Sequence, residues 1–433
     1  MMKWMTTVLL GAALRYLLMH SHYGVTIQNR VEVATPLNSW KRANFITAIE
    51  GAYLYANGTN PYEGDLYHQN PFVLVSVWFL MEKLFAFASA IFINLEVGTI
   101  LMLKSVAAIF IRKLYDNQRS RLSSFAKGTK ELQISPDDVR SVPYYVALAY
   151  MFNPYSILNC VGQTTTVLSN FLLALFLLGM ANRVRLVACM ALALETQINI
   201  YPCVLIIPAA LFIAQDDKHK MQSILITCGM FLMTFLFVNY ASFMIMGDWS
   251  FLDATYGFIF NCRDLQPNIG LFWYFFTEMF DHFRTLFLYT FQINATLLYL
   301  FPLTFKLHKE PIMLLTMLLA LGVVFRPYPC VGDIGMYLSL LPLWKSISKF
   351  MGHNYIVGAT MLVTSILGPT VWHLWIYSNS ANANFYFGMT LVFCTAQIFL
   401  ITDLFFAYIK REFCLKHGMN ITIDGKEARI ALE

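Results

Sequence analysis

The stretch MQSILITCGMFLMTFLFVNYASFMIM (Met221–Met246) contains no charged residue. An α-helix rises about 1.5 Å per residue, so about 20 such residues cross the hydrocarbon core of a bilayer. Similar apolar runs recur from Met5 to Tyr408, and the chain is 58% hydrophobic and 13% charged, with a mean hydropathy of +0.56. Soluble domains carry about 25% charged residues. The chain is therefore predicted to be an all-α, polytopic helical membrane protein.

Hydropathy predicts about twelve transmembrane helices within one integral membrane domain that covers residues 1–433. The predicted spans are 4–20, 86–111, 143–159, 162–181, 186–201, 203–215, 221–246, 284–304, 311–325, 334–349, 354–371 and 388–409. The stretch 71–85 is interpreted as an interfacial or re-entrant helix, because a span there would move the most basic loop to the other side of the membrane. The first segment has no small-residue cleavage site and is interpreted as an uncleaved anchor.

Basic residues indicate the orientation of these spans. With the N-terminus in the cytosol, the cytosolic loops and tail contain 21 of the 30 Lys and Arg residues. The positive-inside rule therefore predicts that both termini are cytosolic. The predicted segments are a first lumenal loop over 20–85 with interfacial helices, a cytosolic loop over 112–142, lumenal segments over 247–283 and 372–388, and a cytosolic tail over 410–433. Asn57 begins a glycosylation sequon in the first lumenal loop.

The late lumenal segments combine aromatic side chains with amides and have few fixed charges. Between Trp372 and Tyr386 the sequence places Asn379, Ser380, Asn382 and Asn384 among aromatic residues. Amides hydrogen-bond to sugar hydroxyls and phosphate oxygens, while flat rings pack on sugars or acyl chains. The alternative is an aromatic belt at the headgroup level. For this segment the composition favours a glycolipid site.

Catalytic chemistry has little support in the sequence. Glu63 and Asp65 have the spacing of a carboxylate pair, but they lie beside a Pro-Tyr turn. Glu278, Asp281 and His282 share a predicted helical face, where a structural polar stripe is the alternative to chemistry. No catalytic nucleophile arrangement and no Cys/His zinc spacing occurs, so no catalytic residue, metal or cofactor is expected. Whether Cys262 and Cys330, both in lumenal segments, form a disulfide is left open.

Several longer motifs resemble one known family. They are RVEVATPLNSWKR (Arg30–Arg42), NPYEGDLYHQNP (Asn60–Pro71), FNPYSILNCV (Phe152–Val161), PNIGLFWYFFTEMFDHF (Pro267–Phe283), FQIN (Phe291–Asn294), YPCVGD (Tyr328–Asp333) and VWHLWIYSNSANANFYF (Val371–Phe387). In these motifs the chain is similar to the PIG-U family, the multi-span subunits of the glycosylphosphatidylinositol (GPI) transamidase of the endoplasmic reticulum. The motifs follow the family order, so the resemblance covers nearly the whole chain.

The resemblance implies a scaffold like that of the GT-C glycosyltransferases, with a large first lumenal loop that lacks their acidic motif. It implies a non-catalytic subunit that binds and presents GPI, with the chemistry on a caspase-like cysteine protease partner and with membrane phospholipids around it. The implied GPI-binding residues are Asn382 and Asn384, with Trp372, His373, Trp375 and Tyr377 as further candidates. The aromatic run Phe272, Trp273, Tyr274, Phe275 and Phe276 is a candidate lipid contact, and internal packing is its alternative.

Two other functions stay open on the sequence. One is a GT-C type mannosyltransferase of GPI or glycan assembly, for which Glu32, Glu63 and Asp65 are the candidate acids. The other is a purely structural subunit that holds its partners together without touching lipid.

Overall fold

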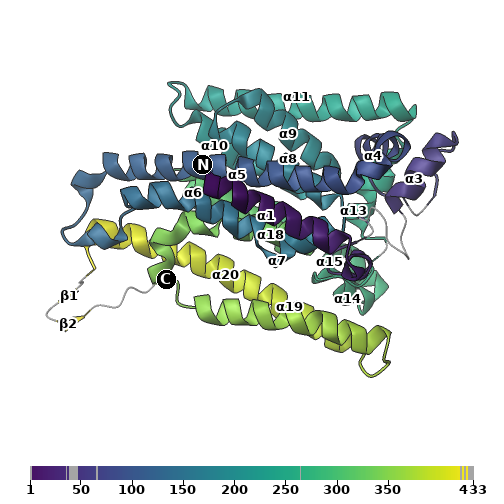
Figure 1. Ribbon diagram of the computed structural model, residues 1–433. Coiled ribbons are helices and arrows are strands. Elements are labelled where there is room, and N and C mark those ends of the chain that lie inside the picture. The colour runs from purple at the N-terminus through teal and green to yellow at the C-terminus, as the bar shows by residue number, and fades with distance from the viewer. Residues whose placement is uncertain are drawn as a thin grey trace.

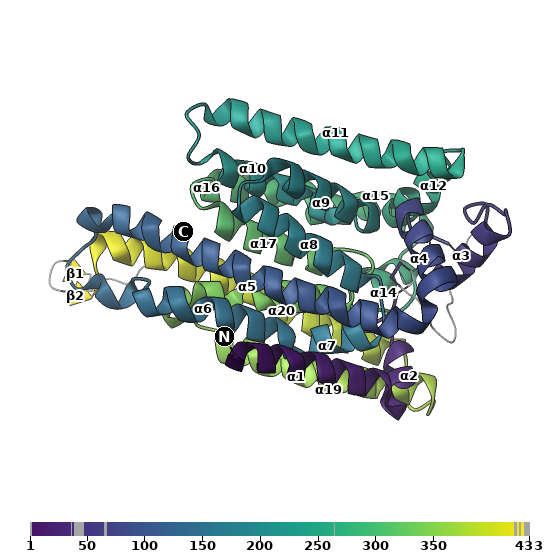
Figure 2. The same ribbon diagram turned by 45° about the horizontal axis from the view of Figure 1, so that its top comes forward.

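The computed structural model describes residues 2–35, 37–38, 47–64, 67–263, 265–419, 422–423 and 426–427. It is a bundle of helices whose long members run in one common direction (Figure 1). Helix α11 forms one edge of the bundle, and α19 lies at the opposite edge (Figures 1 and 2). A two-residue antiparallel strand pair near the C-terminus is the β structure in the described part of the chain.

The elements follow one another along the chain, with η marking short 3-10 or π-helical segments. The first are α1 (Met2–Met19), α2 (His22–Gln28), α3 (Thr47–Ala56), α4 (Pro71–Leu84), η1 (Phe85–Phe87), α5 (Ala88–Ser120), η2 (Leu122–Ser124), η3 (Thr129–Leu132), α6 (Pro136–Met151), α7 (Pro154–Val161), α8 (Thr166–Ala181), α9 (Arg185–Ile198), η4 (Tyr201–Leu205), α10 (Ile206–Ala214) and α11 (Lys220–Met246). They are followed by α12 (Ser250–Leu252), η5 (Asp253–Gly257), α13 (Phe258–Asn261), α14 (Phe272–Thr277), α15 (Asp281–Ile293), η6 (Asn294–Leu298), α16 (Leu300–Leu307), α17 (Pro311–Val324), α18 (Val331–Ser339), η7 (Leu341–Phe350), α19 (Asn354–Ile376), α20 (Ala383–His417), β1 (Thr422–Ile423) and β2 (Lys426–Glu427).

Every predicted span coincides with helix in the structure. Five helical stretches of the described chain are long and apolar enough to cross a membrane, namely 71–120, 220–246, 281–307, 354–376 and 383–417. Four shorter apolar helices cover 4–19, 166–181, 201–214 and 311–324. The protein is thus a multi-span helical membrane protein. The count of twelve crossings, the GT-C likeness and the interfacial placement of 71–85 stay predictions.

Some predicted spans are broken where the sequence contains a helix breaker. The span 143–159 is two helices, because Pro154 has no backbone N–H to continue α6. Asn153 caps the second of them, since its side chain accepts a hydrogen bond from the backbone N–H of Tyr155 at 3.0 Å. The span 334–349 begins as α18 and continues beyond Pro342 as the 3-10 segment η7. A hydropathy profile detects the apolar stretch but does not detect these breaks in the helix.

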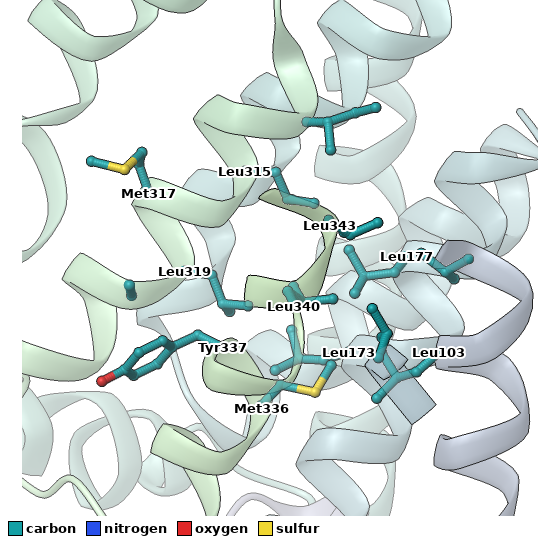
Figure 3. Packing of buried hydrophobic residues seen from close by; sticks show 14 of the residues in the cluster. Leu103, Leu173, Leu177, Leu315, Met317, Leu319, Met336, Tyr337, Leu340 and Leu343 are labelled. Atoms are coloured by element: carbon teal, nitrogen blue, oxygen red, sulfur yellow. The ribbon is translucent and has the colours of Figure 1, made fainter. Parts of the chain in front are cut away.

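The centre of the bundle is a hydrophobic core that joins helices far apart in sequence. Leu103 of α5 and Leu173 of α8 face Met336 and Leu340, which belong to α18 and the residue that follows it (Figure 3). All four side chains are buried. Packing of this kind brings α18, from late in the chain, against helices from its first half.

A buried ion pair joins α1 to α5 inside this bundle. Arg15 Nη2 lies 3.2 Å from Glu96 Oε2, and both side chains are fully buried. The Arg15 guanidinium also donates to the carbonyl of Met151 at 2.8 Å and to Ser156 Oγ at 3.1 Å. Tyr150 donates to the other Glu96 oxygen at 3.0 Å. The pair therefore ties α1 and α5 to the break between α6 and α7.

The predicted lumenal and cytosolic segments lie at opposite ends of the molecule. Helices α2, α3 and α14 and the α19–α20 turn gather at one end, and the α5–α6 connection and β1–β2 gather at the other (Figures 1 and 2). At the second end, Lys345 and Lys349 of η7 pair with Asp138 and Glu131 at 2.7 and 2.8 Å. The hydrogen bond and charge of Lys349 lower the pKa of Glu131. This arrangement is compatible with the predicted orientation, which stays a prediction.

Replacing Arg15 by Met should destabilise the fold by about 3–5 kcal/mol, because the Glu96 carboxylate would stay buried without its cation. The thermal unfolding midpoint of the detergent-solubilised complex measures this change. The double variant Arg15→Met/Glu96→Met should lose less, since it removes both charges. Lys83→Ala is the control, because its pair with Glu82 is solvent-exposed and should contribute under about 1 kcal/mol. Equal shifts for Arg15→Met and Lys83→Ala would contradict this account.

Candidate functional site

The amides singled out in the sequence lie at the turn between α19 and α20. The predicted segment 372–388 includes the last turns of α19 and the first turns of α20, so only 377–382 is non-helical. Asn382 is the N-cap of α20, and its side-chain oxygen accepts a hydrogen bond from the backbone N–H of Phe385 at 3.3 Å. Capping at this position is typical of Asn. Asn382 therefore has a local structural task in addition to any task in binding.

Asn384 lies two residues further along and contacts a second segment that is predicted to be lumenal. Its side-chain oxygen accepts a hydrogen bond from the Tyr274 hydroxyl of α14. Partial desolvation and then the nearby Glu278 carboxylate raise the pKa of Tyr274, so the phenol stays protonated and donates at neutral pH. Asn382 and Asn384 are both exposed, and their Nδ2 groups make no hydrogen bond with the described residues. The turn thus presents two free amide donors, which fit phosphate and sugar oxygens.

Next to the turn, an aromatic cluster is made of Trp273, Trp372, Trp375 and Tyr386. Tyr386 is 1% exposed, and its ring centroid lies 5.0 Å from that of Trp372 and 6.0 Å from that of Trp273. Trp273 stacks on Trp375 with centroids 6.3 Å apart. This cluster packs α14 against the two helices that flank the α19–α20 turn. The packing holds Tyr274 close to Asn384.

The other two predicted GPI-binding residues on α19 face a different direction. His373 and Tyr377 are exposed, and their rings contact each other with centroids 5.3 Å apart. Their spacing of four residues puts them on one helix face, whereas Trp372 and Trp375 share the face that packs inward. The structure thus divides the six predicted residues into exposed amides, an exposed His–Tyr pair and two tryptophans that support the turn.

The aromatic run 272–276 is mostly internal. Phe272, Trp273 and Phe276 are at most 3% exposed, while Phe275 is 36% exposed and Tyr274 is half-buried. Phe272 and Phe276 pack on Phe291 of α15. Packing within the chain therefore accounts for three of the five side chains, and contact with lipid stays a proposal for Tyr274 and Phe275.

A cavity of about 630 Å³ lies next to the aromatic cluster. Helices α19 and α20 line one side, and α7, α18 and the segment 27–33 line the other. Tyr386 belongs both to the cavity wall and to the aromatic cluster. Ligand sites typically have volumes of about 300–1,000 Å³. Hydropathy reasoning missed this cavity, because it arises from the way distant helices lean together and has no signature in any single segment.

A second polar group lies deeper in the bundle. Arg326 pairs with Asp333 at the start of α18, and Ser169 donates to Glu195 at 2.7 Å. Two small cavities of about 20 and 40 Å³ adjoin these side chains, enough for ordered water. Sequence reasoning did not single out Arg15, Glu96 or Glu195. The sequence signal that could have identified these residues is a charged side chain inside an apolar span.

The acidic candidates do not form a catalytic pair among the described residues. Glu32 is buried and lines the 630 Å³ cavity, Glu63 is exposed, and Asp65 lies outside the described residues. The shared helical face predicted for Glu278, Asp281 and His282 is wrong. The helix stops at Glu278, and Phe280 is extended (φ −63°, ψ 136°) before α15 begins at Asp281. In the described part of the chain, no group of three His, Cys, Asp or Glu residues could hold a metal ion.

The remaining predicted positions have simple surroundings. Asn57 is exposed just after α3, and its Nδ2 donates to the carbonyl of Tyr53 at 2.8 Å. Its modification stays a prediction. Cys262 and Cys330 are free thiols with different neighbours: Cys262 donates to the carbonyl of Ile259 and Cys330 to Thr166 Oγ1.

Comparison with known proteins agrees with this architecture. The chain matches the family model for the GPI transamidase subunit PIG-U over residues 9–393. It is 35% identical to the GPI-anchor transamidase component PIGU of Homo sapiens, with 98% of each chain covered. It is 27% identical to the GPI transamidase component GAB1 of Saccharomyces cerevisiae, with 89% of each chain covered. The homologue of GAB1 in Schizosaccharomyces pombe is 26% identical, over 93% of this chain and 92% of that one.

The fold is that of a multi-span helical membrane protein, with an amide-bearing turn between two helices, α19 and α20, that line an apolar cavity. The chain belongs to the PIG-U family of GPI transamidase subunits. The resemblance read from the motifs is therefore confirmed. The other subunits of the GPI transamidase are its partners.

Replacing Trp273 by Ala should destabilise the protein by about 3–5 kcal/mol, because a buried aromatic side chain is removed. Phe275→Ala, two residues further along the same helix, should have a much smaller effect, since Phe275 is partly exposed. The thermal unfolding midpoint of the purified complex measures both. If the run acted mainly through lipid contact, both variants would reduce anchoring of GPI proteins and leave the midpoint unchanged.

Proposed function

We propose that this chain binds the GPI glycolipid and presents it for attachment to the C-terminus of proteins at the membrane of the endoplasmic reticulum. The observation that carries the proposal is a pair of free amide donors at the α19–α20 turn, two and four residues from Tyr386, which lines an apolar cavity among the long apolar helices. GPI has the same two-part character, with a glycan and phosphates outside the bilayer and hydrocarbon inside it. Tyr386 connects the two parts of the site.

Each predicted residue has a distinct place in this proposal. Asn382 and Asn384 donate to phosphate or glycan oxygens, and His373 and Tyr377 extend the exposed surface beside them. Trp372 and Trp375 position the turn through the aromatic cluster. Tyr274 and Phe275 contact the lipid from α14. Each hydrogen bond of this kind contributes about 0.5–1.5 kcal/mol net, so two donors give a useful preference without tight binding.

The chain does no chemistry in this proposal. The caspase-like cysteine protease subunit cleaves the substrate protein and transfers its new carboxyl end to GPI, and this chain holds the acceptor. Both termini lie in the cytosol, and the α19–α20 turn lies in the lumen, as the distribution of basic residues supports.

A mannosyltransferase activity is the alternative, and one observation favours it. Glu32 is an acid that lines the same cavity as the proposed lipid. A glycosyltransferase would need this carboxylate at the sugar. The non-catalytic proposal needs it only as part of the wall.

The amide donors can be tested with isosteric variants. In Asn382→Asp/Asn384→Asp, both positions keep the oxygens that cap α20 and accept from Tyr274, while both N–H donors are lost and the new charges repel phosphate. Surface display of GPI-anchored proteins should fall strongly in cells that depend on this variant, with the complex still assembled. The loss of donors alone should weaken GPI binding by about 1–3 kcal/mol.

Asn382→Ser separates binding from helix capping. Ser caps helices about as well as Asn, so this variant keeps the start of α20 and loses the amide donor. We expect reduced anchoring with an unchanged unfolding midpoint. Full anchoring in both Asn382→Ser and the double Asp variant, measured by flow cytometry of a GPI-anchored reporter, would remove these residues from the site and favour a scaffold.

Glu32→Gln distinguishes presentation from glycosyl transfer. The change keeps the shape of the side chain and removes its ability to ionise. A presenting subunit should retain anchoring within about two-fold, because no step depends on a carboxylate there. Near-complete loss of anchoring with accumulation of an incompletely mannosylated GPI, detected by lipid mass spectrometry, would support the enzyme instead.

A further inference from the structure

The helical stretch 281–307, made of α15, η6 and α16, is the least covered of the five stretches that are long and apolar enough to cross a membrane. In its most apolar eighteen residues, 12% are buried, against 22% in α11 and in α19 and 50% in α20. Its contacts are mainly with α13, η4 and α17, and its buried residues include Leu288 and Gln292. Phe301 and Phe305 are 61% and 81% exposed. One apolar face of this stretch is therefore left open by the described part of the chain.

An amide lies at the middle of the same stretch. Asn294 is thirteen residues from each end of 281–307, which corresponds to about 20 Å at 1.5 Å per residue. The hydrocarbon core of a bilayer is about 30 Å thick, so a residue at this position lies near its centre. The Asn294 side chain is partly exposed and makes no hydrogen bond with any residue that the structure describes. It is too far from either headgroup layer to find a partner there.

Other amides inside long apolar helices are satisfied within the protein. Asn239 of α11 and Gln397 of α20 each donate to the carbonyl four residues earlier, at 2.9 and 3.4 Å. Gln292, one turn before Asn294, donates to the carbonyl of Ile259 at 3.1 Å. Hydrocarbon offers no hydrogen-bond partner, and leaving a polar group without one is costly. Since the described chain gives Asn294 no partner, exposure to lipid alone does not account for this face.

The surroundings of Asn294 suit contact with another helix. Ile293, Leu297 and Leu298 are 48%, 47% and 54% exposed, so the amide is set in an apolar surface. The π-helical turn η6 begins at Asn294 itself, and single π-helical turns within helices are frequent at functional sites. Helices associate inside a membrane through close packing and through hydrogen bonds of amides and hydroxyls across the contact. This face offers both.

We propose that the face formed by Ile293, Asn294, Leu297, Leu298 and Phe301 binds a transmembrane helix of another subunit of the GPI transamidase. The chain belongs to a family of subunits of this complex, so such helices are its neighbours. The partner helix is apolar and has an amide or hydroxyl near its middle, which hydrogen-bonds to Asn294. Because this face carries large side chains, small residues on the partner fit beside that polar group. The inference does not rest on GPI binding at the α19–α20 turn.

Cross-linking from this face identifies what covers it. A diazirine amino acid of leucine size replaces Leu297 or Leu298 in the whole complex, which is illuminated in native membranes. Products are identified by mass spectrometry. We expect both positions to form adducts with a transmembrane segment of the same other subunit. Position 288 is the matched control, since this leucine is 6% exposed and packs within its own chain. Adducts at 297 and 298 with lipid only, or with a differently tagged second copy of this chain, overturn the inference.

Asn294→Leu tests the amide itself. Recovery of the cross-linked subunit with this chain in detergent should fall about three- to ten-fold, the equivalent of one interhelical hydrogen bond in a membrane. Asn294→Gln keeps an amide and should retain most of the recovery. Ile293→Leu, an apolar exchange at the adjacent exposed position, is the control and should have no effect. The amount of this chain in the membrane reports on its folding. Equal recovery with Asn294→Leu and wild type would refute the role of the amide.

Discussion

The buried pair between Arg15 and Glu96 is the constraint on which the arrangement of the bundle depends. Neither charge has access to water, so each must be neutralised and hydrogen-bonded inside the protein. The guanidinium meets this need with Glu96 from α5, the Met151 carbonyl at the end of α6 and Ser156 of α7. These partners are available together only in one register of the four helices. Apolar side chains alone would pack in several registers at similar cost, whereas an unpaired charge would cost several kcal/mol.

The site inherits its geometry from this register. Helix α7 is placed by the Arg15 contacts, and α18 is placed against α7 and α8; Asn170 of α8 donates to the carbonyl of Gly332 at 3.1 Å. Together α7 and α18 form a fixed wall. The α19–α20 hairpin packs against this wall less completely than the inner helices do, and the remaining space is the 630 Å³ cavity. The aromatic cluster around Tyr386 packs at the end of the hairpin, next to the cavity. The two amides of the turn are exposed.

The sequence predicts the fold class and the location of the helices because hydropathy is a property of each segment by itself. It predicts much less about which helix faces which, since the long helices are apolar around most of their circumference. The run 272–276 illustrates the limit. Its aromatic composition fits a lipid contact and a packed interior equally well, and only the position of α15 decides that Phe272 and Phe276 are internal. Asn382 illustrates a second limit of sequence-based prediction. Its amide fits a ligand contact, and its place one residue before α20 also makes it a helix cap. The motifs indicated the family correctly, while the cavity depends on contacts between segments hundreds of residues apart.

The division of polar and apolar groups supports the proposal that the chain holds a glycolipid without acting on it. The lining hydroxyls of Thr364, Ser365 and Thr390 donate to helix carbonyls, so Glu32 is the acid in the lining that could act on a sugar. In the proposed function, hydrocarbon contacts supply affinity that any acyl chain can use, and the amide donors of Asn382 and Asn384 select the lipid through its phosphate and glycan oxygens. The chain then supplies position, which is what a transfer reaction on another subunit requires of its acceptor.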